Sequence, residues 1–193
     1  MNTVPADLLP RQGDGVVLRR MHAGDLAAFQ TYRADPELGR YQGWSALPDA
    51  DALAFLEDVR TAPLFHPGTW MQIGIAEPHH PALVGDIGLF LSDDASEAEI
   101  GFTLARAAQG RGLATAAVRA ALQLVFEATS VRRVRGITDA RNQGSVGLLE
   151  RVGMRRLEER TVEFRSERCV ELIYALERKP GETEFAPLPP ARL

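Results

Sequence analysis

Hydrophobic and polar residues alternate between Glu97 and Leu104. The apolar residues occupy every second position: Ala98, Ile100, Phe102 and Leu104. A period of two predicts a half-buried β-strand. Further along the chain, apolar residues recur at helical spacing in an alanine-rich segment: Val118, Leu122, Val125 and Phe126. Because alanine is the best helix former, this region predicts a strand, a glycine-containing loop and a helix.

Similar patterns divide the rest of the chain. Strands are predicted at 16–21, 70–76, 82–91, 131–138, 154–164 and 169–177. Helices are predicted to begin at Asp25, at Asp49 and at Ser145, and Gly153 is expected to end the last of them. The order of elements predicts an α/β (α+β) fold, with a mixed, mostly antiparallel seven-stranded sheet flanked by about four helices.

The 193 residues suit one domain. Residues 1–14 are polar and interrupted by prolines, so they are expected to form a flexible lead-in to a domain over 15–178. Residues 179–193 contain four prolines and few apolar residues, which indicates a disordered tail.

Composition narrows the class of protein. The formal net charge of −4 disfavours nucleic-acid binding, which usually needs a basic excess. Cys169 is the sole cysteine, so no internal disulfide can form. No apolar run is long enough to span a membrane and the start lacks a signal-peptide core, so we expect a cytoplasmic protein with no membrane contact.

The glycine loop between the first strand and helix has the form of a phosphate site. Such a turn leaves backbone N–H groups free at the positive end of a helix. The motif of nucleotide hydrolases is absent, and the dinucleotide fingerprint lacks its third glycine because Thr115 stands there. An ordinary strand-to-helix turn is the alternative. The pattern Gln109-x-x-Gly112-x-Ala114 resembles the pyrophosphate loop of the GNAT superfamily of N-acetyltransferases.

Further segments carry the same resemblance. The run from Asn142 to Met154 is similar to the N-x-x-S-x-x-L-x-E-K-x-G-F segment of the ribosomal-protein (Rim-type) branch. Glu99-Ile-Gly-Phe102 matches its fourth strand, and the resemblance extends over roughly residues 15–178. The departures are Arg151 in place of lysine, Met154 in place of an aromatic residue, and the lack of a tyrosine over 145–153, which that superfamily often uses as general acid.

The resemblance implies a single GNAT-like domain that uses acetyl-CoA as acetyl donor. In that family the backbone N–H groups of the fourth strand polarise the thioester carbonyl, the loop binds pyrophosphate and an asparagine bonds the pantetheine arm. The residues so implicated are Phe102, Thr103, Leu104, Gln109, Gly110, Arg111, Gly112, Leu113, Ala114, Thr115, Asn142 and Ser145. For Arg111 the alternative is an exposed loop side chain, and for Asn142 an Asx-type turn.

Two residues are candidates for catalysis. The resemblance implies that Ser145 gives its hydroxyl proton to the departing sulfur, although a helix N-cap is the alternative. Strand alternation places Glu99 on the same side as Thr103, so Glu99 is the first candidate base, directly or through water. A surface ion pair is the alternative for Glu99, and Asp139 is the second candidate base.

Several questions remain open at this level. The acceptor could be a protein N-terminus, a small amine or an amino-sugar antibiotic, and Arg40, Tyr41 and Trp44 lie where the family's acceptor wall often forms. A non-catalytic acyl-CoA binding module is the alternative function. His79 and His80 lack a third ligand nearby in sequence, so no metal site is expected. A monomer and a homodimer are both compatible with the sequence.

Overall fold

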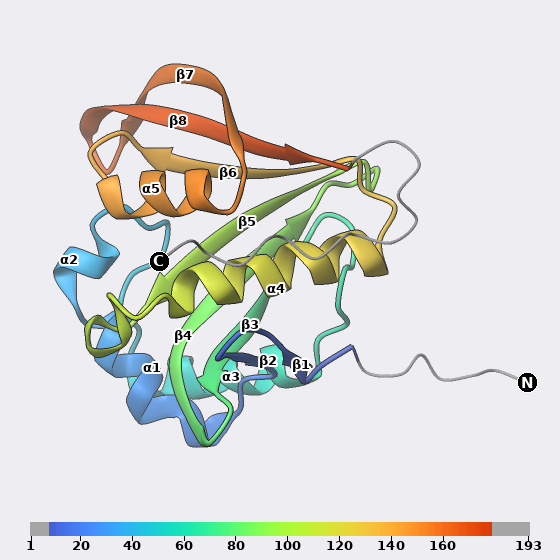
Figure 1. Cartoon of the computed structure of the whole chain (residues 1–193). Helices are drawn as coiled ribbons and strands as arrows, with labels where there is room; N and C mark the ends of the chain where they lie inside the picture. The colour runs from blue at the N-terminus through green and yellow to red at the C-terminus, as the bar shows by residue number, and fades with distance from the viewer. Residues whose placement is uncertain (1–7, 179–193) are drawn as a thin grey trace, which may run out of the picture.

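A computed structural model describes residues 8–178, which form one eight-stranded sheet with helices on both faces (Figure 1). The strands are β1 (Arg11–Gln12), β2 (Val17–Arg19), β3 (Trp70–Glu77), β4 (His80–Leu91), β5 (Glu97–Leu104), β6 (Arg133–Asp139), β7 (Arg155–Phe164) and β8 (Glu167–Glu177). The helices are α1 (Leu26–Arg33), α2 (Pro36–Gly39), α3 (Asp49–Thr61), α4 (Leu113–Ala128) and α5 (Gln143–Arg151), with short 3-10 turns η1 (Ala23–Asp25) and η2 (Arg106–Ala108).

The strand order is β1-β2-β3-β4-β5-β6-β8-β7. Every neighbouring pair is antiparallel except β5 and β6, which run parallel. The predicted fold class is therefore confirmed, but the sheet has eight strands instead of seven. The additional strand, β1, has two residues, too few for an alternating pattern, and it lies within the expected lead-in, where Leu9 is also buried.

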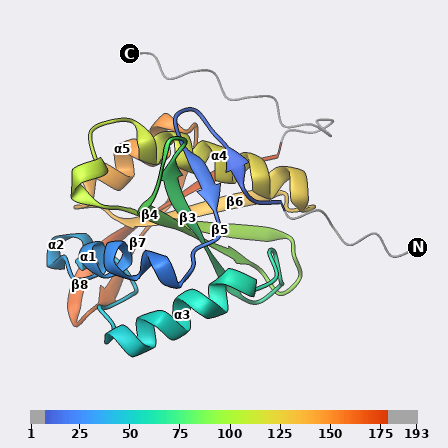
Figure 2. The same cartoon turned by 90° about the horizontal axis from the view of Figure 1, so that it is seen from below.

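Helices cover both faces of the sheet (Figure 2). Helix α4 packs on one face, where Ala117, Val118, Ala121, Leu122 and Val125 are completely buried in the main core. The alternating apolar side chains of β5 belong to the same core. Helices α1 and α3 cover the opposite face, and their apolar side chains form a smaller second core.

Local capping explains one further helix. Asp35 and Pro36 end α1 as expected, but Asp35 also accepts hydrogen bonds from the N–H groups of Glu37 and Leu38 (3.0 and 3.3 Å). Proline suits the first turn of a helix, so the short α2 follows directly. Within residues 8–178, the helices are too short or too polar to cross a membrane.

The centre of the sheet opens into a gap. Strands β5 and β6 pair only where Glu97–Glu99 lie beside Arg133–Arg135. Beyond these residues β5 stays with β4 as far as Leu104, while β6 stays with β8 as far as Asp139. Figure 1 shows the two strands diverging toward the start of α4. This divergence positions the site described next.

Candidate active site

A cavity of about 530 Å³ lies where the gap meets the beginnings of α4 and α5. All of the predicted cofactor-binding residues except Arg111 line it: Phe102, Thr103, Leu104, Gln109, Gly110, Gly112, Leu113, Ala114, Thr115, Asn142 and Ser145. The fold thus brings together segments that are distant in sequence. Contact of these residues with a ligand stays a prediction.

The glycine loop holds its backbone open toward this cavity. Gly110 and Gly112 have φ of 74° and 79°, which L side chains rarely adopt, and a Cβ at either position would meet no protein atom within 4 Å. The first α4 bond that involves this loop runs from the Ala116 N–H to the Gly112 carbonyl (3.1 Å). Within residues 8–178, the N–H groups of residues 113–115 have no bonding partner. The loop therefore presents free donors.

Two predicted loop residues use their side chains elsewhere. The Gln109 side chain donates to the Leu104 carbonyl (3.0 Å), which fastens the loop to the end of β5. Arg111 forms a two-pronged ion pair with Glu77 at the end of β3, with Nη1–Oε1 at 3.1 Å. This hydrogen bonding lowers the pKa of Glu77. Arg111 does not line the cavity, so a contact with phosphate through its side chain would require leaving Glu77.

The free edge of β5 faces the gap. The Phe102 carbonyl accepts from Gln42 Nε2 (3.3 Å), and the Leu104 carbonyl from Gln109, whereas the Ala105 N–H donates to the Val84 carbonyl in β4 (2.8 Å). Because both backbone groups of a strand residue point to the same side, the N–H groups of Phe102 and Leu104 also face the gap. The sequence could not show this divergence. The predicted polarisation of a thioester carbonyl by N–H groups of β5 depends on it.

A second, narrower space lies at the closed end of the gap. Its volume is about 40 Å³, and its apolar walls include Ile100, Ile137 and Leu149. It shares Tyr41, Gln42, Phe102, Asn142 and Ser145 with the larger cavity. The two spaces therefore meet at these residues, Ser145 among them.

The beginning of α5 differs from one sequence alternative. The helix begins at Gln143, and its N-cap is Asn142, whose Oδ1 accepts from the Ser145 N–H (3.2 Å). Asn142 thus caps the helix through the N–H three residues on, in place of the Asx-type turn considered for it, and Ser145 is not the cap. Ser145 is half-buried and lines both spaces.

Glu99 lies at the last position where β5 pairs with β6. Burial raises the pKa of its carboxyl, and Glu171 adds to this effect, while Arg135, with Nη2 at 3.9 Å, opposes it. Glu99 lines neither space, but Gly101, the next residue on the same face of β5, lines the narrow one. Two strand residues span roughly 7 Å, so the Glu99 backbone lies about that far along β5 from the part of the strand that lines the narrow space.

Asp139 is a poorer candidate base. Its carboxylate accepts hydrogen bonds from the Arg141 guanidinium (2.7 Å) and the Arg141 N–H (2.8 Å). These contacts, led by the side-chain bond to Arg141, lower the pKa of Asp139. A carboxylate stabilised in this way has less tendency to take a proton.

The sequence predicted only part of one wall of the cavity. Glu37, Leu38 and Gln42 join the anticipated Tyr41 there, although β5 lies some sixty residues away in the chain. Asp35 helps to hold this wall by pairing with Arg106, which lowers the pKa of Asp35 to about 2. No local pattern marks these residues, because the packing of α1 on β4, with α2 beside α1, brings them to the gap.

Within the described part of the chain, no group of three or more His, Cys, Asp or Glu side chains is arranged to hold a metal ion. The predicted absence of a metal stays a prediction.

Comparison with known proteins identifies the family. The acetyltransferase (GNAT) domain family matches residues 16–155, which is most of the chain. The chain therefore belongs to the GNAT acetyltransferase family. The prediction of this family, and of an acetyltransferase, is confirmed.

Solved structures share the fold. A GNAT-family acetyltransferase from Bacillus anthracis has a TM-score of 0.76 and 20% identity, covering 86% of this chain and 96% of its own. RimJ from Mycobacterium smegmatis, solved with a CoA disulfide, has a TM-score of 0.74 and 20% identity over 88% of both chains. RimL, a ribosomal L7/L12 α-N-protein acetyltransferase solved with coenzyme A, has a TM-score of 0.74 and 15% identity, covering 87% and 97%. At this identity the likeness concerns the fold.

Proposed function

We propose that the protein transfers an acetyl group from acetyl-CoA directly to a primary amine. The observation that carries this proposal is the gap between β5 and β6, whose free strand edge leads from the open glycine loop to Ser145. A cosubstrate with an anionic end, an extended arm and a reactive carbonyl fits this sequence of surfaces. The coenzyme A bound by RimJ and RimL supports the choice of donor.

The glycine loop would hold the pyrophosphate. The free N–H groups of residues 113–115 lie in the first turn of α4, where the helix dipole favours negative charge. The glycines at 110 and 112 leave room for close approach. Asn142 would bond the pantetheine arm through its amide nitrogen, since its oxygen is engaged by Ser145.

The chemical step needs stabilisation of two developing charges. The amine nitrogen attacks the thioester carbonyl, whose oxygen gains negative charge that the N–H groups of Phe102 or Leu104 would stabilise. The carbon–sulfur bond then breaks, and the sulfur takes a proton from the Ser145 hydroxyl. Ser145 regains a proton from solvent. The proton lost by the amine passes to water and then to Glu99. The products are the N-acetyl amine and free coenzyme A.

Among primary amines, an α-amino group suits this site better than a lysine. At pH 7 about one α-amino group in ten is neutral, but only about one lysine amine in 2,500, given pKa values near 7.7–8.0 and 10.4. The candidate base Glu99 acts at a distance and Asp139 is bound to Arg141, so the site offers little help in deprotonation. We therefore favour protein N-termini as acceptors, with small-molecule amines of low pKa second.

A direct experiment tests the proposal. Purified protein is titrated with acetyl-CoA by calorimetry, and free thiol is then measured with a panel of N-terminal peptides, lysine peptides and small amines. We expect binding and amine-dependent thiol release. Binding without release for any amine would instead indicate a non-catalytic acyl-CoA module. Absence of binding would contradict the assignment of the glycine loop.

A further inference from the structure

The structure also suggests how the acceptor side of the gap is held in place. Segment 40–44 follows α2, and its residues Tyr41 and Gln42 line both the cavity and the narrow space. They belong to the wall that the proposed acetyl-CoA contacts do not use. Gln42 spans to β5, where its Nε2 donates to the Phe102 carbonyl at 3.3 Å. Any change in this segment therefore alters the acceptor side.

Segment 40–44 has little structure of its own. It belongs to no helix or strand, and it is tied to α2 by the bond from the Gln42 N–H to the Gly39 carbonyl (3.1 Å) and by the Trp44 ring, which lies beside Gly39. Trp44 fixes the far end by packing on the buried Arg33 guanidinium, 4.2 Å from the ring centre. The position of Gln42 must be fixed by contacts from elsewhere.

Those contacts come from across the gap. Arg165, at the tip of the β7–β8 hairpin, donates through Nη2 to the carbonyls of Gln42 (3.1 Å) and Trp44 (2.6 Å). The hairpin turn consists of Arg165 and Ser166, with φ of 52° and 62°. Turns of this kind favour asparagine and glycine. The turn conformation does not favour arginine, so the role of Arg165 lies in the hydrogen bonds that its side chain makes.

We propose that Arg165 is a positioning residue for the acceptor. By holding the backbone at Gln42 and Trp44, it keeps Gln42 against Phe102 and fixes the wall that an amine passes on its way to the gap. This inference rests on the proposed function, because it assigns the remaining wall to the acceptor. It adds a connection between the β7–β8 hairpin and segment 40–44 that depends on one guanidinium.

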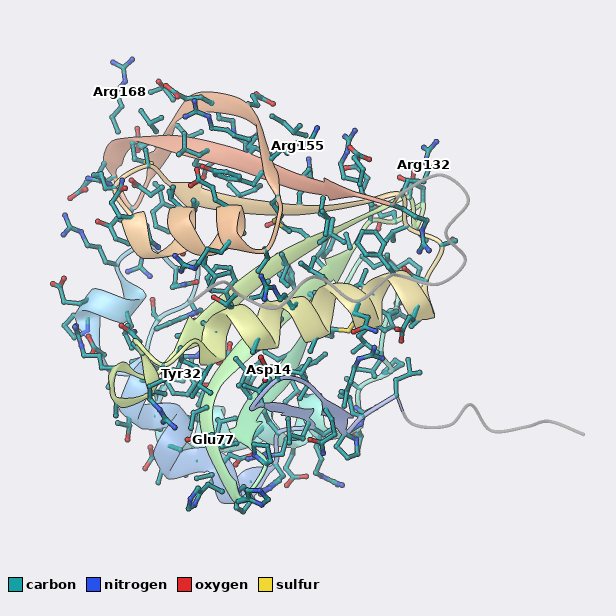
Figure 3. All side chains as sticks on the ribbon, viewed as in Figure 1. Asp14, Tyr32, Glu77, Arg132, Arg155 and Arg168 are labelled. Carbon is teal, nitrogen blue, oxygen red and sulfur yellow. The ribbon has the colours of Figure 1, made fainter. Side chains whose placement is uncertain are left out.

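The hairpin supplies a matched control. Arg168 lies three residues from Arg165, and Figure 3 shows its side chain standing away from the ribbon. This side chain is exposed, and no hydrogen bond or ion pair is found for it within residues 8–178. Arg165→Ala and Arg168→Ala therefore remove the same charge from the same hairpin, but only the first removes the contacts with segment 40–44.

Two measurements on these variants test the inference. Hydrogen–deuterium exchange should show faster uptake over residues 40–47 in Arg165→Ala than in Arg168→Ala or the unchanged protein. With the best amine from the panel, the acceptor KM should rise about tenfold in Arg165→Ala, because the two hydrogen bonds that hold segment 40–44 are lost. The KM for acetyl-CoA and the melting temperature should stay close to those of Arg168→Ala.

The outcomes separate the two proposals. Equal exchange in the two variants would overturn the role of Arg165, whatever the activity. Faster exchange with an unchanged acceptor KM would also overturn it, because the segment would then be mobile without consequence for the amine. A protein that binds acetyl-CoA but acetylates no amine would refute the proposed function, and with it the acceptor role, even if exchange changed as expected.

Discussion

Replacing Gly112 by alanine separates the backbone's need for glycine from the ligand's need for space. Gly112 has φ of 79°, and a Cβ there would meet no protein atom within 4 Å. The methyl group would therefore project into the cavity that Gly112 lines. Gly15 provides the control, because it has φ of 69°, is equally uncrowded and does not line the cavity.

Gly112→Ala should have two effects, a loss of stability and a loss of ligand affinity. An alanine in the left-handed region costs about 1–2 kcal/mol, which for a chain of this length lowers Tm by roughly 2–8 °C. Both variants should show this loss. Only Gly112→Ala should also weaken binding, since the methyl group would hold a phosphate away from the N–H groups of residues 113–115. Loss of one charge-assisted hydrogen bond costs about 1.5–3 kcal/mol, or roughly 10- to 150-fold in Kd.

Thermal unfolding measures the first effect, and calorimetric titration with acetyl-CoA, well below the lower Tm, measures the second. We expect similar Tm values for the two variants and weakened binding for Gly112→Ala alone. Binding by Gly112→Ala as tight as that of the unchanged protein would refute the assignment of this loop to pyrophosphate. Equal weakening in Gly15→Ala would show that general destabilisation, and not the cavity, accounts for the loss.

Three further changes test other parts of the site. Ser145→Ala should lower kcat at least about 100-fold while the Kd for acetyl-CoA changes little, and unchanged thiol release would remove Ser145 from the mechanism. Burial raises the pKa of Glu99, so its basic form is lost as pH falls through that raised pKa, and kcat/KM should fall with it. Glu99→Gln should abolish this fall of kcat/KM on the acidic side. An identical pH profile would exclude Glu99 as base. Arg33→Met should lower the free energy of unfolding by about 3–5 kcal/mol, because it leaves the buried Asp86, 2.9 Å from Arg33, without its cation. Urea titrations measure this loss, and a loss below about 1 kcal/mol would contradict the account.

Much of the fold could be predicted from local patterns. The alternation from Ala98 to Leu104 predicts β5, and the apolar stripe from Val118 to Phe126 predicts the buried face of α4, because periodicity directly reflects which face packs on the core. Strand β1 escaped prediction because two residues carry no period. Helix α2 escaped because a proline that ends one helix can also begin the next.

The site could be predicted only where local backbone geometry creates it. Two glycines before a helix indicate free N–H groups whatever the neighbouring side chains are. The side-chain partner of Arg111 could not be predicted, because Glu77 lies in the β3–β4 hairpin, 34 positions earlier in the chain. The same holds for Gln42, whose contact with Phe102 joins residues sixty positions apart in the chain.

The two sides of the gap are therefore built from different kinds of contact, which explains why the sequence identifies the donor more readily than the acceptor. The donor side consists of a strand edge, a glycine loop and two helix beginnings, whose N–H groups depend on backbone conformation. The acceptor side consists of segment 40–44, which is held by Trp44 on Arg33 and by Arg165 from a distant hairpin. Tyr41 and Gln42 on that wall belong to neither hydrophobic core nor to the glycine loop. Under the proposed assignment, changes at these two positions should therefore alter acceptor preference while the fold and acetyl-CoA binding stay the same.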